Sequence, residues 1–262
     1  MSQGSKTVDK AKVAAVSQRR TEKLSEIIAR AIVHDSRGLP PGTMLPSEAK
    51  LLEQYQVGRT SLREALRVLE MQGLIVIRPG PGGGPMLTEV DSAHFGRMAS
   101  LYLHKAGATY RDTLDARLIL EPVVAGIVAE QQDPKHIHEL QEYLQRSSTS
   151  LDENLPTDLD ERSVEDLRQL EFHMMLMGMS GNPVINLVGR SLQELRVDRD
   201  SVEMFRRHEP PNGTMVHEMI ARAMIDGRPA QAEQLMREHM REFIDYTHEH
   251  HPELLAQTVS WH

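Results

Sequence analysis

The sequence predicts a mostly α-helical protein with one small β-hairpin, divided between two domains. The chain has 262 residues, which is too many for one ordinary domain and sufficient for two. Aromatic residues make up only 4% of the chain while Met occurs 15 times, a balance that favours helical cores over β-sandwiches. Apolar residues also recur at helical spacing over most of the sequence, and a short β-rich run interrupts this pattern only near the first third.

Composition excludes several classes of protein. There are no cysteines, which excludes a disulfide scaffold, thiol catalysis and metal sites with Cys ligands. No stretch approaches the roughly 18 apolar residues of a membrane span, so we expect no contact with a membrane. The polar residues 1–17 lack the apolar core of a signal peptide, and these features together fit a cytoplasmic protein.

The net charge of −8 hides an uneven distribution along the chain. Residues 1–90 hold 13 Lys and Arg against 9 Asp and Glu, a net charge of +4, whereas residues 91–262 hold 17 against 29, a net charge of −12. A basic front and an acidic back indicate an interaction module joined to a second domain. We expect residues 1–15 to form a flexible basic arm, which either contacts phosphates or is a solvated tail.

Residues 16–90 change character over short distances, as in a small domain with several elements. Ser47 is suited to cap a short helix, Gly73 is suited to end a longer one, and Gly and Pro residues separate the elements. In chain order, we predict helices over residues 17–34, 48–54 and 59–71, a strand over 74–77, a Gly- and Pro-rich loop over 79–85 and a returning strand over 86–88. A helix, a helix–turn–helix and a hairpin in this order form a winged helix-turn-helix.

Three arginines lie four residues apart on the helix predicted over residues 59–71. Arg59, Arg63 and Arg67 therefore form one exposed stripe opposite the Leu-rich face of the helix. A narrow amphipathic helix fits the major groove of DNA, where Arg pairs with guanine edges and phosphates. A solvated basic face is the alternative, but this stripe lies on the second helix of a helix–turn–helix in the basic part of the chain.

Further candidate DNA contacts surround this stripe. Thr60 and Ser61 lie in the first turn of the helix, where hydroxyls and free N–H groups can meet backbone phosphate. Lys50 and Arg78 extend the basic surface on either side. The Gly-rich loop allows the backbone of the wing to approach a groove without side-chain clashes.

Three motifs follow one another within residues 20–90. They are Leu45-Pro46-Ser47-Glu48, then Val57-Gly58-Arg59-Thr60-Ser61-Leu62-Arg63-Glu64-Ala65-Leu66, and then Gln72-Gly73-Leu74 before the Gly-rich wing. On these residues the chain resembles the GntR family of bacterial transcription regulators. Carried over by position, the resemblance implies DNA contacts from Arg59, Thr60, Arg63 and Gly80, whereas Arg67 rests on the helix geometry.

The chain departs from this family pattern at two positions. The Arg that commonly follows the Leu-Pro-Ser-Glu motif is replaced by Ala49, which removes one expected DNA contact, and Lys50 partly substitutes for it. The usual Ser before the first Arg of the second motif is Gly58, which caps a helix at a cost of only a few tenths of a kcal/mol.

Residues 92–250 read as one helix after another, separated by short polar or Gly- and Pro-containing breaks. The predicted helices cover residues 94–105, 110–131, 135–147, 164–180, 183–206, 214–226 and 229–248. Six or seven helices with short connections predict an all-α bundle. Pro122 lies inside one of these helices and is expected to kink it. We expect residues 251–262 to form a loose tail.

Three of the 13 histidines stand out by their spacing, because each is embedded in an apolar-periodic helix and can point into the bundle. They are His173, His217 and His239. Three imidazoles from three helices can hold a borderline divalent metal ion with open positions. The alternative is that each is an ordinary core histidine bonded to a carbonyl group.

The same helices carry a second set of motifs, over residues 93–247. They are Arg117-Leu118-Ile119-Leu120-Glu121, Phe172-His173 followed by Ser180-Gly181-Asn182-Pro183, His217-Glu218-Met219-Ile220-Ala221-Arg222-Ala223-Met224, and His239. On these residues the second domain resembles the FCD ligand-binding domain of the FadR subfamily. The resemblance implies a Zn²⁺ or similar ion held by an Asp, a His four residues later and two further His about 22 residues apart.

His173, His217 and His239 match the three His of that pattern, but Gln169 stands at the position of the Asp. A Gln offers only a neutral carbonyl, so we expect a weakened metal site. The competing interpretation is a metal-free pocket in which the three His donate hydrogen bonds to a ligand carboxylate.

The same resemblance makes Arg117 a candidate for binding an effector together with the three His. A structural salt bridge is the alternative role of this Arg. We expect the effector to be a small carboxylate, a fatty acid or an acyl thioester, since a group of Met residues can form a deformable apolar lining. Ordinary core filling is the alternative role of these Met residues.

Together, these features predict a ligand-responsive transcription regulator, most simply a repressor. A homodimer would place two recognition helices on a palindromic double-stranded operator, and the effector would change their spacing. A three-His metal-dependent enzyme fused to a DNA-binding module is the alternative, although His217-Glu218 lacks the second His of an H-E-x-x-H motif because Ala221 stands there. An architectural DNA-binding protein without an effector is a further alternative.

Overall fold

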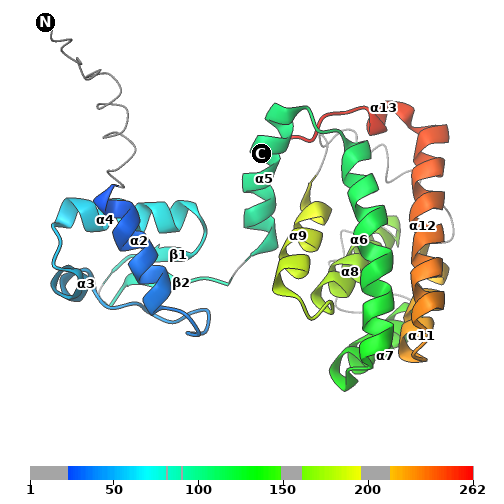
Figure 1. Ribbon diagram of the computed structural model, residues 1–262, viewed down its shortest axis with the longest axis horizontal. Helices are drawn as coiled ribbons and strands as arrows, with labels where there is room; N and C mark the ends of the chain where they lie inside the picture. The colour runs from blue at the N-terminus through cyan, green and yellow to red at the C-terminus, as the bar shows by residue number, and fades with distance from the viewer. Residues whose placement is uncertain (1–22, 81, 90, 149–160, 196–212, 262) are drawn as a thin grey trace, which may run out of the picture. The chain divides into compact units, whose positions relative to one another are not determined.

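The computed structural model describes residues 23–80, 82–89, 91–148, 161–195 and 213–261, with the backbone alone at residue 148 and over 161–169 (Figure 1). The chain divides into two compact units, residues Met1–Asp91 and Ser92–His262. The basic arm predicted over residues 1–15 lies outside the described residues.

The first unit contains three described helices and a two-stranded antiparallel sheet. They are α2 (Leu24–Asp35), α3 (Glu48–Tyr55), α4 (Arg59–Met71), β1 (Ile75–Arg78) and β2 (Gly84–Leu87). In the hairpin Ile75 pairs with Leu87 and Arg78 pairs with Gly84, so β2 begins two residues earlier than the sequence pattern suggests. The predicted winged helix-turn-helix with a β-hairpin wing is confirmed.

Local sequence explains the tight helix–turn–helix. Helix α3 is capped at its C-terminal end by Gln56, whose φ of 52° is left-handed, and α4 begins after Gly58, which has extended backbone angles. Ser47 occupies the N-cap position of α3 as predicted, but its side chain makes no capping hydrogen bond. The Leu-rich face of α4 is buried against α2, and the core of the unit contains Ile28, Ile32, Leu51, Leu62, Leu66 and Leu69.

Gly83 has a specific role in the turn of the wing. A Cβ atom at this position would lie 2.2 Å from the carbonyl oxygen of Arg78, so the backbone would have to move. We expect Gly83→Ala to distort the hairpin, to destabilise the first unit by about 1–3 kcal/mol and to weaken DNA binding. Thermal unfolding and a gel-shift titration check this. Gly58→Ser is the control, because nothing lies within 4 Å of a Cβ there, and equal behaviour of the two variants would contradict the prediction.

The second unit is an all-α bundle, as predicted. Its described helices are α5 (Ser92–Ala106), α6 (Tyr110–Gln131), α7 (Pro134–Ser148), α8 (Glu161–Gly178), α9 (Pro183–Glu194), α11 (Gly213–Ile225), α12 (Pro229–His250) and the short α13 (Pro252–Leu255). The helix predicted over 183–206 is described only as far as Glu194, where α9 ends. In the described part of the chain, no helix is both long and apolar enough to span a membrane.

Helices α6 and α12, the longest of the described helices, run side by side through the second unit (Figure 1). Helix α6 begins with a capping box, in which Thr109 and Asp112 bond to each other's backbone N–H groups. It continues through the buried Pro122 as one helix, so the proline does not end it. The predicted kink at this position stays a prediction.

The C-terminal residues are packed, so the expectation of a loose tail was wrong for residues 251–261. Leu254, Leu255 and Val259 are buried, and Leu255 lies in a cluster with Leu114 and Ile244. The backbone N–H of Val259 donates to the carbonyl of Ala108 at 2.9 Å, beside a bridge between Thr109 and Thr258. The segment is too short for a periodic pattern, and its apolar residues find their partners only in the folded bundle.

Candidate functional sites

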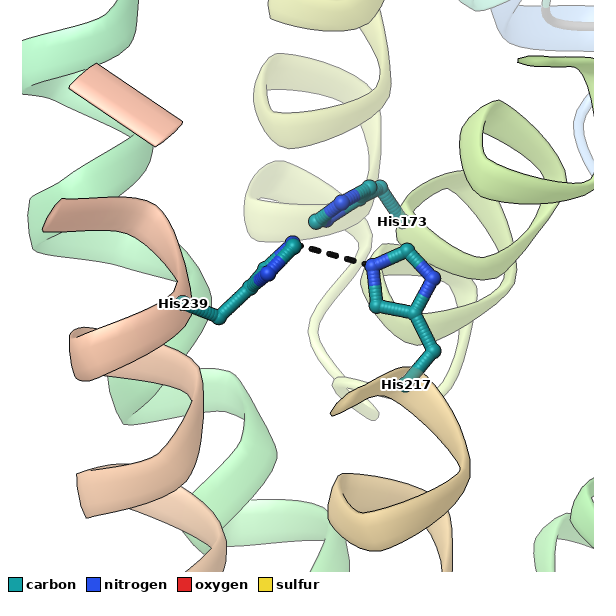
Figure 2. A group of neighbouring side chains, drawn as sticks. All are labelled: His173, His217 and His239. Atoms are coloured by element: carbon teal, nitrogen blue, oxygen red, sulfur yellow. Dashed lines mark hydrogen bonds between the residues drawn. The ribbon is translucent and has the colours of Figure 1, made fainter. Parts of the chain in front are cut away.

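Three imidazole rings converge inside the second unit, and each comes from a different helix (Figure 2). His173 lies on α8, His217 on α11 and His239 on α12, and one ring nitrogen of each lies within 4.8 Å of the others. The Nε2 atoms of His217 and His239 are only 3.0 Å apart. All three side chains are buried. The structure therefore brings together the three histidines that the sequence singled out.

Helical periodicity explains why these histidines point inward. His217 is one turn before Ile220 and Ala221, and His239 is adjacent to Met240, all of which are buried in the core of the bundle. Phe172 is also buried and stacks on the ring of His217, with 4.3 Å between the ring centroids. The histidines thus occupy core-facing positions of their helices, where the neighbouring side chains are apolar.

A buried carboxylate that was not predicted as a site residue adjoins the three histidines. Glu121 on α6 is 1% exposed, and its Oε2 accepts a hydrogen bond from Nδ1 of His173 at 2.5 Å. Its Oε1 accepts from Nε of Arg117 and from Nε2 of Gln193, both at 2.7 Å. The signal for Glu121 was present in the sequence, because this charged residue occupies a core-facing position next to Pro122 on α6.

Arg117 is therefore engaged in an ion pair with Glu121, one turn later on the same helix, and its side chain is only 13% exposed. This is the structural salt bridge that the sequence left open as an alternative to effector binding. Gln193, on α9, was not selected from the sequence either, and no local pattern distinguishes it from an ordinary surface glutamine.

Burial and neighbouring charges together set the protonation of these groups. Burial lowers the pKa of His217 well below its usual value, and the nearby His173, His239 and Arg117 lower it further. Burial and His173 lower the pKa of His239 to about 3. Burial would raise the pKa of Glu121, but Arg117 and His173 outweigh this and hold it well below its usual value. At neutral pH, His217 and His239 are thus neutral and Glu121 is charged.

The residues present fit a divalent metal ion. Neutral imidazoles each offer a nitrogen lone pair, and His nitrogens are ligands that Zn²⁺ and similar borderline ions accept. The buried Nδ1 of His217 has no hydrogen-bond partner among the described residues. In the contact between Nε2 of His217 and Nε2 of His239, only one of the two nitrogens can carry the shared proton, so the other is an acceptor with a lone pair. The three histidines could therefore hold a metal ion. The side chain of Gln169 is outside those that the structure describes.

Further buried polar atoms on α9 and α11 have no hydrogen-bond partner among the described residues. They are Oδ1 of Asn186, Nε of Arg190 and Oγ1 of Thr214. Asn186 and Arg190 are one turn apart on α9, and Gln193 on the same side of the helix bonds to Glu121. Unsatisfied buried groups of this kind are rare in native proteins without a bound water, ion or ligand.

The Met residues mostly fill the core, which is the alternative that the sequence left open. Met177, Met179, Met224, Met236 and Met240 are 0–1% exposed and belong to the main apolar cluster of the bundle. Met215 and Met219 on α11 are exposed instead. This arrangement gives little support to a long apolar effector.

In the first unit, α4 presents the predicted arginine stripe on its exposed face. Arg59, Arg63 and Arg67 are all exposed, opposite the buried Leu62, Ala65, Leu66 and Leu69. Among the other predicted DNA contacts, Ser61 is half-buried, and the exposed residues are Lys50, Thr60, Arg78 and Gly80. Nε of Arg63 donates to Oε1 of Glu48 on α3 at 3.0 Å, a contact that the sequence did not predict. Both side chains are exposed, so this ion pair is weak and open to exchange.

Comparison with known families agrees with this division into two units. Residues 22–83 match the family described as bacterial regulatory proteins, gntR family. Residues 112–242, which are half of the chain, match the FCD domain.

Similar proteins of known type span most of the chain. The HTH-type transcriptional repressor NanR of Salmonella newport is 29% identical over 230 residues, which cover 84% of this chain and 83% of that protein. NanR of Salmonella typhimurium is also 29% identical over 230 residues, covering 84% of this chain and 82% of that protein. A solved structure, Streptococcus agalactiae GntR, has a TM-score of 0.58 and 23% identity and covers 83% of this chain and 98% of that chain, which shows a shared fold.

Proposed function

Because the chain belongs to the gntR family of bacterial regulatory proteins and carries an FCD domain, we propose that it is a ligand-responsive repressor that binds a palindromic operator as a homodimer. It is a transcription regulator and not an enzyme, so the alternative of a three-His metal-dependent enzyme is excluded. The observation that carries the ligand-responsive part of the proposal is the buried three-histidine cluster. The similarity to NanR supports repression as the mode of action.

Helix α4 is the proposed reader of the operator. Its exposed arginines are spaced one turn apart, so Arg59, Arg63 and Arg67 can contact base edges and phosphates along one groove. The hydroxyl of Thr60 and the free N–H groups of the first turn suit a backbone phosphate. Gly80 in the wing loop and Lys50 and Arg78 would add contacts at the sides. A regulator of bacterial genes acts where the DNA is, so we place it in the cytoplasm.

The second unit supports a homodimer through its exposed apolar residues. On α5, four large apolar side chains are 42–70% exposed and cluster at helical spacing: Phe95, Met98, Leu101 and Tyr102. Exposed apolar patches on a folded chain indicate contact with another protein surface. A second copy of the chain suits this role, because a two-fold axis in the protein matches a two-fold axis in a palindromic operator.

We propose Zn²⁺ or another divalent ion as the resident metal, held by His173, His217 and His239 with open positions. When bound, it would supply a positive charge that attracts the carboxylate of an effector. The histidine side chains come from α8, α11 and α12, so a ligand that meets all three would couple the positions of three helices. Contacts that differ between two arrangements of the helices are what an effector needs to change DNA affinity.

The effector is proposed to be a small carboxylate. Arg117 already forms an ion pair with Glu121, so Arg117 is not the first candidate to bind the carboxylate of a ligand. Arg190 is the better candidate, because its Nε is buried without a partner among the described residues, on the side of α9 that carries Gln193. The partly buried Asn186, one turn away, would add a second polar contact.

Operator binding measured with and without candidate ligands tests this function. Gel-shift titrations with the DNA upstream of its own gene should show sequence-specific binding that falls steeply with salt and weakens when small carboxylates are added. Sequence-independent binding, or binding that no carboxylate changes in the presence of Zn²⁺, would contradict the proposal.

In the same assay, the Arg190→Ala variant should need a concentration of the active carboxylate about tenfold or more higher than the unaltered protein for the same release from DNA. The reason is that hydrogen bonds to charged groups contribute about 1.5–3 kcal/mol. Its DNA affinity without ligand should equal that of the unaltered protein. Arg241→Ala, an exposed position on α12, is the matched control and should leave the ligand response unchanged. An unaltered ligand response in Arg190→Ala would show that the carboxylate binds elsewhere.

A further inference from the structure

We propose that Glu121 is a positioning residue for the metal centre: its carboxylate fixes which nitrogen of His173 carries the proton, so that the other faces the histidine cluster as a free ligand atom. This inference deepens the proposed function and rests on the metal-binding part of it. It concerns a residue of α6, whereas the three histidines lie on α8, α11 and α12.

The contacts of Glu121 divide its two oxygens between two tasks. Oε1 accepts hydrogen bonds from Arg117 and Gln193, at 2.7 Å each, and these two donors come from different helices. Oε2 is left for Nδ1 of His173, at 2.5 Å. Arg117 and Gln193 thus fix the position of the carboxylate through Oε1, and Oε2 orients the imidazole ring of His173.

The hydrogen bond to Oε2 determines the tautomer of His173. A carboxylate oxygen only accepts hydrogen bonds, so Nδ1 of His173 must be the donor and must carry a proton. When the ring is neutral, its Nε2 then has a free lone pair. A His that binds a metal through one nitrogen commonly donates its other N–H to a carboxylate, which orients the ring and makes it a more basic ligand.

This arrangement also supplies a negative charge that the ligand set lacks. Gln169 stands where the related pattern has an Asp, so a neutral amide replaces the carboxylate at that position of the pattern. Glu121 is buried, forms an ion pair with Arg117 and lies one hydrogen bond away from His173. It therefore places negative charge next to the centre without occupying one of the positions around the ion.

A structural ion pair alone does not explain the geometry. Arg117 and Gln193 would already satisfy one oxygen of the carboxylate, and a surface position would avoid the cost of burying the charge. The third contact of the carboxylate is with the ring of His173. The centroid of this ring lies 4.8 Å from that of His217 and 5.5 Å from that of His239, so the contact connects Glu121 to the histidine cluster.

The variant Glu121→Gln tests this role. An amide can keep a bond from Arg117 to its oxygen, but its NH₂ group would then face His173 and donate to Nδ1, which drives the proton to Nε2. We expect the Zn²⁺ affinity, measured by competition with a colorimetric chelator, to fall about 10- to 100-fold. Glu233→Gln is the matched control, because the 43% exposed side chain of Glu233 pairs with Arg237 on α12 and its change should leave the affinity unchanged.

A second measurement needs no variant and no metal. Imidazole ¹⁵N chemical shifts of the metal-free protein should show the proton of His173 on Nδ1, and in a folded Glu121→Gln variant on Nε2. A proton on Nε2 of His173 in the unaltered protein would overturn the proposal even if the variant does not fold. Thermal unfolding of the metal-free variant reports any loss of the Arg117 contact separately.

The outcomes distinguish this inference from the proposed function. If the unaltered protein and Glu121→Gln bind Zn²⁺ equally well, Glu121 does not position the centre, but the metal site stands. If the unaltered protein binds no divalent ion at all, the metal-binding part of the proposed function fails, and this inference fails with it. A loss of affinity together with the change of tautomer supports both.

Discussion

Replacing Arg63 by alanine is expected to abolish specific operator binding while Zn²⁺ and ligand binding stay intact. Arg63 is exposed at the centre of the arginine stripe on α4, and each bidentate contact of Arg with a guanine contributes about 1–3 kcal/mol of discrimination. A homodimer would lose two such contacts, about 2–6 kcal/mol, which is a loss of roughly 30-fold to more than 10,000-fold in affinity. Fluorescence anisotropy with operator and scrambled DNA measures both the loss and the specificity.

Two controls separate the guanidinium group from its surroundings. Glu48→Ala removes the partner of Arg63 on α3 and should change operator affinity far less than Arg63→Ala, because the pair is exposed and weak. Arg241→Ala removes an exposed arginine of the second unit and should have no effect. Operator affinity of Arg63→Ala within twofold of the unaltered protein would show that another surface reads the DNA.

Replacing His239 by alanine is expected to remove high-affinity metal binding. One of three ligand nitrogens would be lost, so the loss of Zn²⁺ affinity should exceed the roughly 100-fold that the loss of an outer hydrogen-bond partner can cause. His239 suits this test better than His217, since the ring of His217 stacks on Phe172 and its removal would also leave a cavity in the core.

Thermal unfolding with increasing Zn²⁺ measures the effect, because an ion that binds only the folded chain raises its stability with concentration. The midpoint should rise for the unaltered protein and for His138→Ala, whose exposed side chain pairs with Glu142 on α7. For His239→Ala, the midpoint should stay constant. A Zn²⁺-dependent rise of equal size in His239→Ala would place the metal at a different site.

Much of the fold could be predicted because its signals are local. The spacing of apolar residues located α6 at residues 110–131, and the glycines and prolines marked where helices end. The arginine stripe and the three inward histidines follow from the same helical period. Gly58, which stands at the N-cap position of α4, was also recognisable in the sequence as the residue before the first Arg of the motif.

What could not be predicted depends on contacts between distant segments. Glu121 is one turn after Arg117 on α6, but only the burial of both side chains in the folded bundle shows that Arg117 pairs with this residue and not with a ligand. The contact of Gln193 with Glu121 joins α9 to α6 across 72 positions of the chain. The packing of Leu254 and Val259 likewise becomes visible only in the folded bundle.

The packed C-terminus has a practical consequence. Val259 and Thr258 hold the residues just before α6, and α6 carries both Arg117 and Glu121. Removing the final five residues would delete these contacts, and an affinity tag joined there through a stiff linker would strain them, at the start of the helix that supports the histidine cluster. A tag at the opposite end of the polypeptide leaves these contacts intact.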